Sequence, residues 1–310
     1  MKRVVVTGIG MITPLGLNKD ESFEAIIGAK CGIDTIAQFD PSRLSVQIAA
    51  EVKGFDPASV MPLKEVKKAD RFIQFGIKSS IEAIKDSGLE MDKTNLELFG
   101  ISSVSGIGGL INIEKNAIVC ERKGPKRISP FFIPSALSNM LGGFVSIEHG
   151  LKGPNVASVT ACAAGTHGII EAFKTIALGG AERMLVVASE ATICEVGIGG
   201  FAAMKALSTR NDDPKRASRP FDKDRDGFIM GEGSASLVLE DYDLAKARGA
   251  KIYGELIGFG ESGDANHITT PAKDGPVRAI KAALKFASQN KQSLSIDYIN
   301  AHGTSTPAND

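Results

Sequence analysis

Short apolar runs alternate with segments of helical periodicity along most of this chain, and this alternation restricts its fold more than any other feature. Val4 to Val6 is β-branched and uninterrupted, as expected of a buried strand. Residues 69–86 place apolar side chains on one helical face, and Gly88 suits the end of that helix. Strands are also expected at 97–105, 155–161, 183–189, 234–240, 252–260 and 296–303, and helices at 163–178 and 277–288. This order predicts an α/β protein with mostly parallel sheets.

The beginning of the chain has a counterpart near its end. A strand, an excursion, a helix and a second strand open the sequence, and the same plan restarts near Lys251. We therefore expect an N-terminal half over residues 1–250 and the start of a similar half over 251–310. The restart stops after its second strand, so the second half is expected to be incomplete.

Charge and cysteine content exclude several classes of protein. Lysine plus arginine and aspartate plus glutamate number 36 each in 310 residues, so no overall charge favours nucleic acid or a membrane surface. The four cysteines are scattered, which argues against a disulfide framework or a zinc site and indicates a cytoplasmic protein. No run approaches the roughly 18 apolar residues of a membrane span.

Cys162 is the main candidate for chemistry. It lies between a predicted strand and a predicted helix in "ASVTACAAGTHGII" (157–170). Unpaired amides and partial positive charge at a helix start favour a thiolate, lower its pKa and can hold an oxyanion. A small apolar residue in a tight core is the competing interpretation, and the local sequence does not decide between the two.

His302 is the best candidate partner among the histidines, because it ends a predicted strand, where α/β folds place catalytic groups. A loop histidine bonded to carbonyl groups is the alternative. A dyad of Cys162 and His302 would also suit a cysteine hydrolase that acts on a thioester or an amide.

Two segments imitate ligand sites. Asp222, Asp224 and Asp226 match the start of a calcium loop, but position twelve of that loop is Gly233 and not glutamate. "SGIGG" (105–109) lacks the spacing of a dinucleotide fingerprint and is expected to be a close-packing turn. We therefore expect no metal and no cofactor.

Three motifs together resemble the beta-ketoacyl-acyl-carrier-protein synthases, the condensing enzymes of fatty acid synthesis, and most closely the bacterial type II enzymes. They are "TACAAGTHGI", "ALSTRNDDPKRASRPFDKDRDGFIMGEG" and "YINAHGTSTPAND", and the resemblance covers essentially the whole chain. It implies the thiolase fold, in which two similar α/β halves stack as α-β-α-β-α layers, and a cytoplasmic homodimer. It also assigns the aspartate-rich segment to a family signature.

The resemblance implies an acyltransferase. An acyl chain passes from acyl carrier protein to Cys162, and malonyl-acyl carrier protein then loses carbon dioxide. The resulting carbanion joins the acyl group, which gives 3-oxoacyl-acyl carrier protein, two carbons longer. His302 matches one of the family's two catalytic histidines, and Cys162 matches its nucleophile.

Other roles are implied by position in the family. Ile107 and Phe201 correspond to residues that shape the acyl pocket, and Thr304 and Thr306 to residues that recognise malonyl. Docking of the acidic carrier protein is implied for a basic set: Lys64, Lys67, Lys68, Lys126, Arg127 and Lys205. A solvated surface is the alternative interpretation of such charges.

The family pattern continues past the last motif of this sequence. Members carry a second catalytic histidine in a "GHLLGAAG"-like segment and a glycine-rich "FGFGG" loop with a gating phenylalanine. We therefore expect this chain to be part of a longer enzyme, with little condensation on its own. The alternatives are a non-catalytic or inactive fragment or partner subunit, and a thiolase that uses coenzyme A. Acyl chain-length preference is not predicted.

Overall fold

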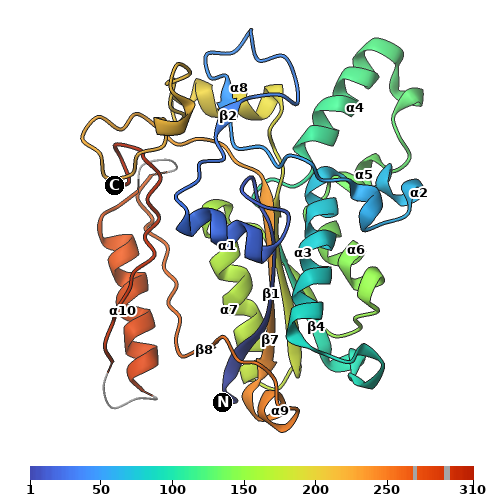
Figure 1. Ribbon diagram of the computed structural model, residues 1–310, viewed down its shortest axis with the longest axis vertical. Helices are drawn as coiled ribbons and strands as arrows, with labels where there is room; N and C mark the ends of the chain where they lie inside the picture. Colours follow the sequence, from blue (N-terminus) through green and yellow to red (C-terminus); the bar gives the residue numbers. More distant parts are fainter. Residues whose placement is uncertain (268–270, 290–293) are drawn as a thin grey trace.

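The computed structural model describes residues 1–267, 271–289 and 294–310 and is built around one six-stranded sheet (Figure 1). The strands follow the order β5-β4-β6-β7-β1-β8 across the sheet. Their bounds are β1 (Val4–Ile12), β4 (Phe99–Val104), β5 (Asn155–Ser158), β6 (Arg183–Glu190), β7 (Gly233–Asp241) and β8 (Gly254–Leu256).

The sheet is mixed. β4 runs parallel to β5 and β6, whereas β7 is antiparallel to β6 and β1, and β8 is antiparallel to β1. The expectation of mostly parallel sheets is therefore wrong. Glu190 at the end of β6 pairs with Gly233 at the start of β7. The chain between them thus stays at one end of the sheet and returns in the opposite direction.

Helices cover both faces of the sheet. α3 (Arg71–Ser87) and α6 (Met140–His149) contact one face, and α7 (Ala164–Ala177) contacts the other (Figure 1). Residues of β6 alternate between two cores: Leu185 belongs to the cluster on the α3 side and Met184 to the cluster on the α7 side. The two-residue period of an extended strand produces this division.

The remaining elements surround this core. The helices are α1 (Lys19–Ile27), α2 (Leu63–Val66), α4 (Leu110–Lys123), α5 (Phe132–Ala136), α8 (Glu195–Ala203), α9 (Tyr242–Ala247) and α10 (Asp274–Ser288). β2 (Asp34–Thr35) pairs with β3 (Ile48–Ala49). The 3-10 turns are η1 (Pro57–Ser59), η2 (Met91–Lys93), η3 (Leu96–Leu98), η4 (Pro125–Arg127), η5 (Ala161–Ala163) and η6 (Pro214–Arg216). In the part of the chain that the structure describes, no helix combines the length and hydrophobicity of a membrane span.

One packing arrangement occurs near the beginning of the chain and again after β8. Gly8 and Gly10 of β1 lie so close to α3 that an added Cβ would meet the carbonyl oxygens of Ala83 and Ser79 at 2.2 and 2.0 Å. The backbone after β8 approaches α10 in the same way, with Gly258 and Gly260 in the corresponding places. Both segments thus bring a glycine backbone directly against a helix.

The expected helices at 69–86, 163–178 and 277–288 are confirmed as α3, α7 and α10. The strand expected at 252–260 forms only over β8, where it pairs with Val4–Val6. The strand expected at 296–303 is wrong, because those residues have no strand partner among the described residues. Their apolar side chains, including Tyr298 and Ile299, are exposed.

Candidate active site

Cys162 lies on a sharp turn between β5 and α7. β5 ends at Ser158 and α7 begins at Ala164, and η5 carries the cysteine between them. Ala161 has a φ of 51°, a backbone conformation that non-glycine residues seldom adopt and that is frequent at functional turns. The Cys162 side chain is exposed, so the alternative that it fills a buried core position does not hold.

The turn presents backbone amides close to the thiol. The Ala163 amide donates to Thr160 O over 3.2 Å, and the Ala164 amide donates back to Ala161 O. The N-cap residue Ala163 provides no side-chain cap, so the first turn of α7 keeps amides that can stabilise a negative charge. The location therefore suits an oxyanion.

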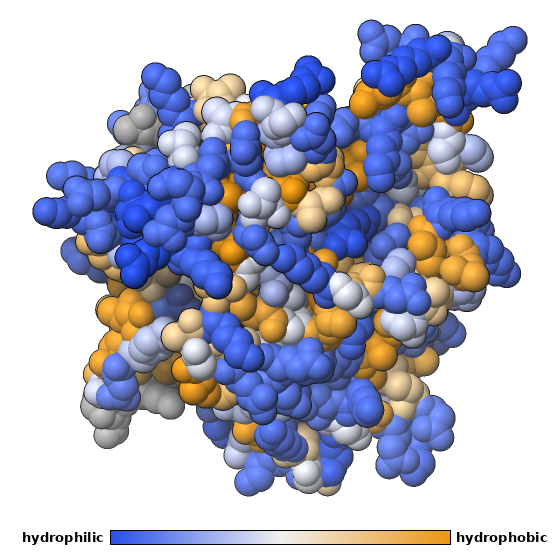
Figure 2. All heavy atoms as spheres, turned by 45° about the horizontal axis from the view of Figure 1, so that its top comes forward, coloured by the Kyte–Doolittle hydropathy of each residue, from blue (hydrophilic) through white to orange (hydrophobic). Residues whose placement is uncertain are grey.

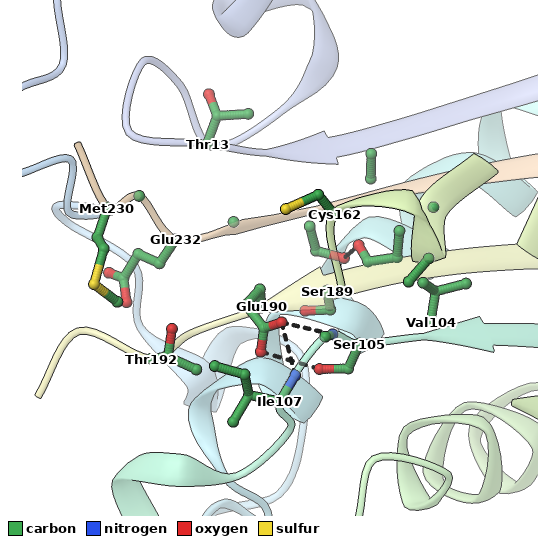
Figure 3. Close-up of a pocket in the computed structure, with 18 of the residues that line it drawn as sticks. Thr13, Val104, Ser105, Ile107, Cys162, Ser189, Glu190, Thr192, Met230 and Glu232 are labelled. Atoms are coloured by element: carbon green, nitrogen blue, oxygen red, sulfur yellow. Dashed lines mark hydrogen bonds between the residues drawn. The ribbon is translucent and has the colours of Figure 1, made fainter. Parts of the chain in front are cut away.

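A cavity of about 660 Å³ opens beside the thiol (Figure 3). Figure 3 shows Cys162 between Thr13 on one side and Glu190 with the loop of Ile107 on the other. Both predicted acyl-pocket residues, Ile107 and Phe201, line this cavity together with Cys162. Most of its surface is apolar, as a site for an acyl chain requires.

Glu190 organises one wall of the cavity from the end of β6. Its carboxylate accepts hydrogen bonds from the amides of Gly106, Ile107 and Gly108 over 2.6, 3.1 and 3.3 Å, and from Ser105 Oγ over 3.1 Å. Burial raises the pKa of Glu190, and the donors of the loop oppose that rise. The expected close-packing turn at 105–109 is confirmed, because a Cβ at Gly109 would lie 2.6 Å from Ala136 Cα.

His302, Thr304 and Thr306 are not among the described residues that line the cavity. They belong to the segment 302–310, where His302 is exposed and the hydroxyls of Thr304 and Thr306 lie 2.9 Å apart. The structure thus brings Cys162, Ile107 and Phe201 into one cavity and places the other three in a separate loop.

The aspartate-rich signature holds that separate loop. The Arg219 amide donates to Ser305 Oγ over 2.9 Å, and the Gly227 amide donates to Ser305 O over 3.0 Å. Arg225 Nε donates to Thr306 O over 3.1 Å. Asp226 pairs with Arg219 at 3.0 Å, so this carboxylate already has a cationic partner.

The same signature continues into the cavity wall. Phe228, directly after Gly227, lines the cavity and contacts the ring of Phe201, with ring centroids 5.5 Å apart. The signature therefore contacts the loop of residues 302–310 and also lines the cavity that contains Cys162.

The predicted docking residues lie at the same end of the molecule as the cavity. Lys64 is in α2, Lys67 and Lys68 follow it, Lys126 and Arg127 are in η4, and Lys205 follows α8. Lys68 Nζ lies 5.0 Å from the ring centroid of Phe131. This contact brings the segment after α2 close to the segment that follows η4. In Figure 2 the protruding upper right, over the end of α4, is hydrophilic and borders apolar side chains.

Sequence reasoning did not indicate the contacts of two polar side chains. One is Glu190, whose partners at 105–108 lie more than eighty residues away in the sequence. The other is His167, whose Nδ1 lies 2.6 Å from Thr160 Oγ1 and whose Nε2 lies 3.6 Å from Glu261. Glu261 is distant in sequence, so no local pattern indicates this contact.

Sequence relatives agree with this geometry. The beta-ketoacyl synthase N-terminal domain matches residues 1–245, and the beta-ketoacyl synthase C-terminal domain matches residues 253–310. A Vibrio cholerae protein named 3-oxoacyl-(acyl-carrier-protein) synthase 2 is 49% identical over 311 residues, which cover 100% of this chain and 75% of that protein. A Staphylococcus aureus protein of the same name is 44% identical and is covered to 74%.

Solved structures give the same result. A beta-ketoacyl synthase from Burkholderia phymatum matches with a TM-score of 0.90 and 33% identity, over 100% of this chain and 76% of that chain. The type II polyketide ketosynthase AntDE, solved with its acyl carrier protein AntF, matches with a TM-score of 0.86 and 30% identity, over 100% and 75%. The expected thiolase-type α/β fold is confirmed, in a chain that spans about three quarters of its relatives. The chain belongs to the beta-ketoacyl synthase family.

Proposed function

We propose that this chain carries the acyl-accepting site of a 3-oxoacyl-acyl carrier protein synthase, which extends fatty acids by decarboxylative condensation. The observation that carries the proposal is the exposed Cys162 on a strained turn at the start of α7, beside an apolar cavity. The names of the relatives, 3-oxoacyl-(acyl-carrier-protein) synthase 2, support the same reaction.

Two transfers make up the reaction. The Cys162 thiolate attacks the acyl thioester, the turn amides stabilise the tetrahedral oxyanion, and the carrier thiolate leaves and takes up a proton. The malonyl thioester then releases carbon dioxide, and its electron pair forms an enolate. The enolate carbon attacks the acyl-Cys162 carbonyl, and the thiolate leaves as the new carbon–carbon bond forms.

The remaining site residues are part of this proposal. His302 donates a hydrogen bond to the enolate oxygen, Thr304 and Thr306 bind the malonyl group, and Ile107 and Phe201 contact the acyl chain. The exposed loop of His302, beside the family signature, leaves this histidine accessible to a substrate. We also propose the division into halves at residues 1–250 and 251–310, which the repeated glycine packing supports.

Acyl carrier protein is the proposed partner. The related ketosynthase AntDE was solved in complex with its own acyl carrier protein, and the basic residues around α2 and η4 of this chain would attract an acidic protein. We place the enzyme in the cytoplasm, in keeping with its free cysteines.

The chain is further proposed to pair with a second copy along β5. β5 is at the edge of the sheet, and Val156 and Val159 are exposed there. An exposed apolar edge strand favours pairing with an identical strand related by a twofold axis. Light scattering should give twice the chain mass for the wild type and the single mass for Val156→Lys.

Incubation with an acyl-acyl carrier protein tests the proposed function, with mass spectrometry of the cysteine-containing peptides. We expect an acyl adduct on Cys162 that disappears in Cys162→Ala and persists in Cys31→Ala, which removes another exposed thiol. Addition of a malonyl donor should yield a 3-oxoacyl product. Hydrolysis alone would indicate a thioesterase, use of coenzyme A donors alone a thiolase, and no adduct a non-catalytic subunit.

A further inference from the structure

Glu190 connects the end of β6 to the loop that carries Ile107. Three consecutive amides and the Ser105 hydroxyl donate to its carboxylate. Hydrogen bonds to an ionised acceptor are stronger than neutral ones, and each amide would lose its partner if the carboxylate were absent. Figure 3 shows these bonds beneath the thiol of Cys162.

The loop has little freedom to move in other directions. A Cβ at Gly106 would lie 2.8 Å from Glu190 Oε2 and 3.7 Å from Ala161 Cα, so the loop lies between the carboxylate and the nucleophile turn. At its other end, the Gly109 amide donates to Ala136 O over 3.0 Å. Ile107 is therefore held in the cavity wall between two fixed contacts.

We propose that Glu190 is a positioning residue that sets acyl chain-length selection by holding Ile107 against the cavity. This inference rests on the proposed function, because it assigns the cavity to an acyl chain. Glu190 acts through the loop and has no part in the bond-making steps. Without its carboxylate the amides of Gly106, Ile107 and Gly108 turn towards other acceptors, and the side chain of Ile107 no longer defines the cavity shape.

Glu190→Gln is the test variant, because it keeps the shape of the side chain and replaces one acceptor oxygen with a donor that faces the loop amides. Ser105→Ala is a milder second variant that removes one donor. Glu51→Gln is the matched control: this glutamate is buried, accepts from the amides of Ala37 and Gln38 at 3.0 Å each, and does not line the cavity.

Hydrogen exchange measures whether Glu190 holds the loop. In Glu190→Gln we expect the peptide that contains Gly106–Gly108 to exchange at least about tenfold faster, and the peptide with Ala37 and Gln38 to keep its rate. In Glu51→Gln the peptide with Ala37 and Gln38 should exchange faster, and the peptide that contains Gly106–Gly108 should keep its rate. Unchanged exchange of the loop in Glu190→Gln would overturn the proposal.

Acylation of Cys162 by hexanoyl- and tetradecanoyl-acyl carrier protein measures selection. We expect the ratio of the two rates to change at least about fivefold in Glu190→Gln, less in Ser105→Ala and not at all in Glu51→Gln. A folding defect would lower both rates equally and leave the ratio constant, which would contradict the proposal. If the wild type forms no adduct with either donor, the proposed function fails, whereas the exchange result still reports whether Glu190 holds the loop.

Discussion

Gly260 lies against Ala279 in the same way as Gly10 lies against Ser79. In each pair, a Cβ added to the glycine would lie 2.0 Å from the carbonyl oxygen of the helix residue. In both places the backbone thus lies directly on a helix, with no side chain between them. The glycines are required here by close approach, since no other residue lacks the clashing atom.

Gly10→Ala should therefore destabilise the protein by about 1–3 kcal/mol or more, because β1 or α3 must shift to admit the methyl group. Gly200→Ala is the control, since no atom lies within 4 Å of a Cβ added there in α8. That variant should be at least as stable as the wild type, because alanine favours a helix. Urea unfolding of the two variants measures the difference, and equal midpoints would argue against the close contact.

The main helices could be predicted from the sequence, because each follows from a local pattern. The periodicity of α3 is an example. The antiparallel entry of β7 could not be predicted in this way. The direction of β7 depends on the path of the chain between Glu190 and Gly233. The spacing of apolar residues in the sequence does not predict that path.

The site was predicted unevenly for a similar reason. The position of Cys162 between a strand and a helix could be predicted, because β5, the turn and α7 are adjacent in sequence. Glu190 could not, because its partners at 105–108 are more than eighty residues away. The absence of a strand at 296–303 also depends on long-range pairing, since an apolar run forms a strand only beside another strand.

Phe173 should contribute strongly to the attachment of α10. Its ring contacts those of Phe259 and Phe286, with centroids 5.6 and 6.0 Å apart, and thereby joins α7 to the second half. We expect Phe173→Ala to cost about 3–5 kcal/mol and to make α10 the first site of cleavage in limited proteolysis. Cleavage that begins elsewhere at an unchanged rate would contradict this role.

The ionised form of buried Asp70 should lower the free energy of unfolding, so the protein should be less stable at neutral pH than at acidic pH. Burial raises the pKa of this carboxyl from 3.8 to about 6, and Oδ1 has no partner among the described residues. The folded protein therefore binds this proton more tightly than the unfolded chain does, so stability falls as pH rises from about 4 to about 6.

In the wild type the Asn112 amide donates to Asp70 Oδ2 over 2.9 Å. Asp70→Asn removes the charge and keeps an acceptor for this amide. We expect this variant to be more stable than the wild type at neutral pH by up to about 3 kcal/mol, and equally stable near pH 4. Urea unfolding at several pH values measures the difference, and a constant difference at every pH would contradict the assignment.

His149 should have the opposite effect in an overlapping pH range. Burial lowers its pKa from 6.5 to about 4, and its Nε2 lies 2.9 Å from Ser80 Oγ. The unfolded chain takes up this proton first, so stability is complete above pH 6.5 and is lost as pH falls towards 4. In His149→Gln we expect that loss, about 3 kcal/mol, to disappear from the pH profile of unfolding. A profile that coincides with that of the wild type would refute the prediction.

Lys67 and Lys126 should accelerate acylation only when the acyl group arrives on carrier protein. Both side chains are exposed, and the contact of Lys68 with Phe131 brings their two segments together. Charge reversal by Lys67→Glu or Lys126→Glu should slow acylation of Cys162 by acyl-acyl carrier protein about tenfold at low salt, and less at high salt, where the attraction is screened. An acyl-coenzyme A donor lacks the acidic protein surface, so its rate should stay unchanged. Lys93→Glu, at an exposed lysine of η2 outside the proposed docking set, is the control and should leave both rates unaltered. Equal slowing with both donors would mean that the variants disturb the cavity. That result would contradict the proposal that Lys67 and Lys126 bind the carrier protein.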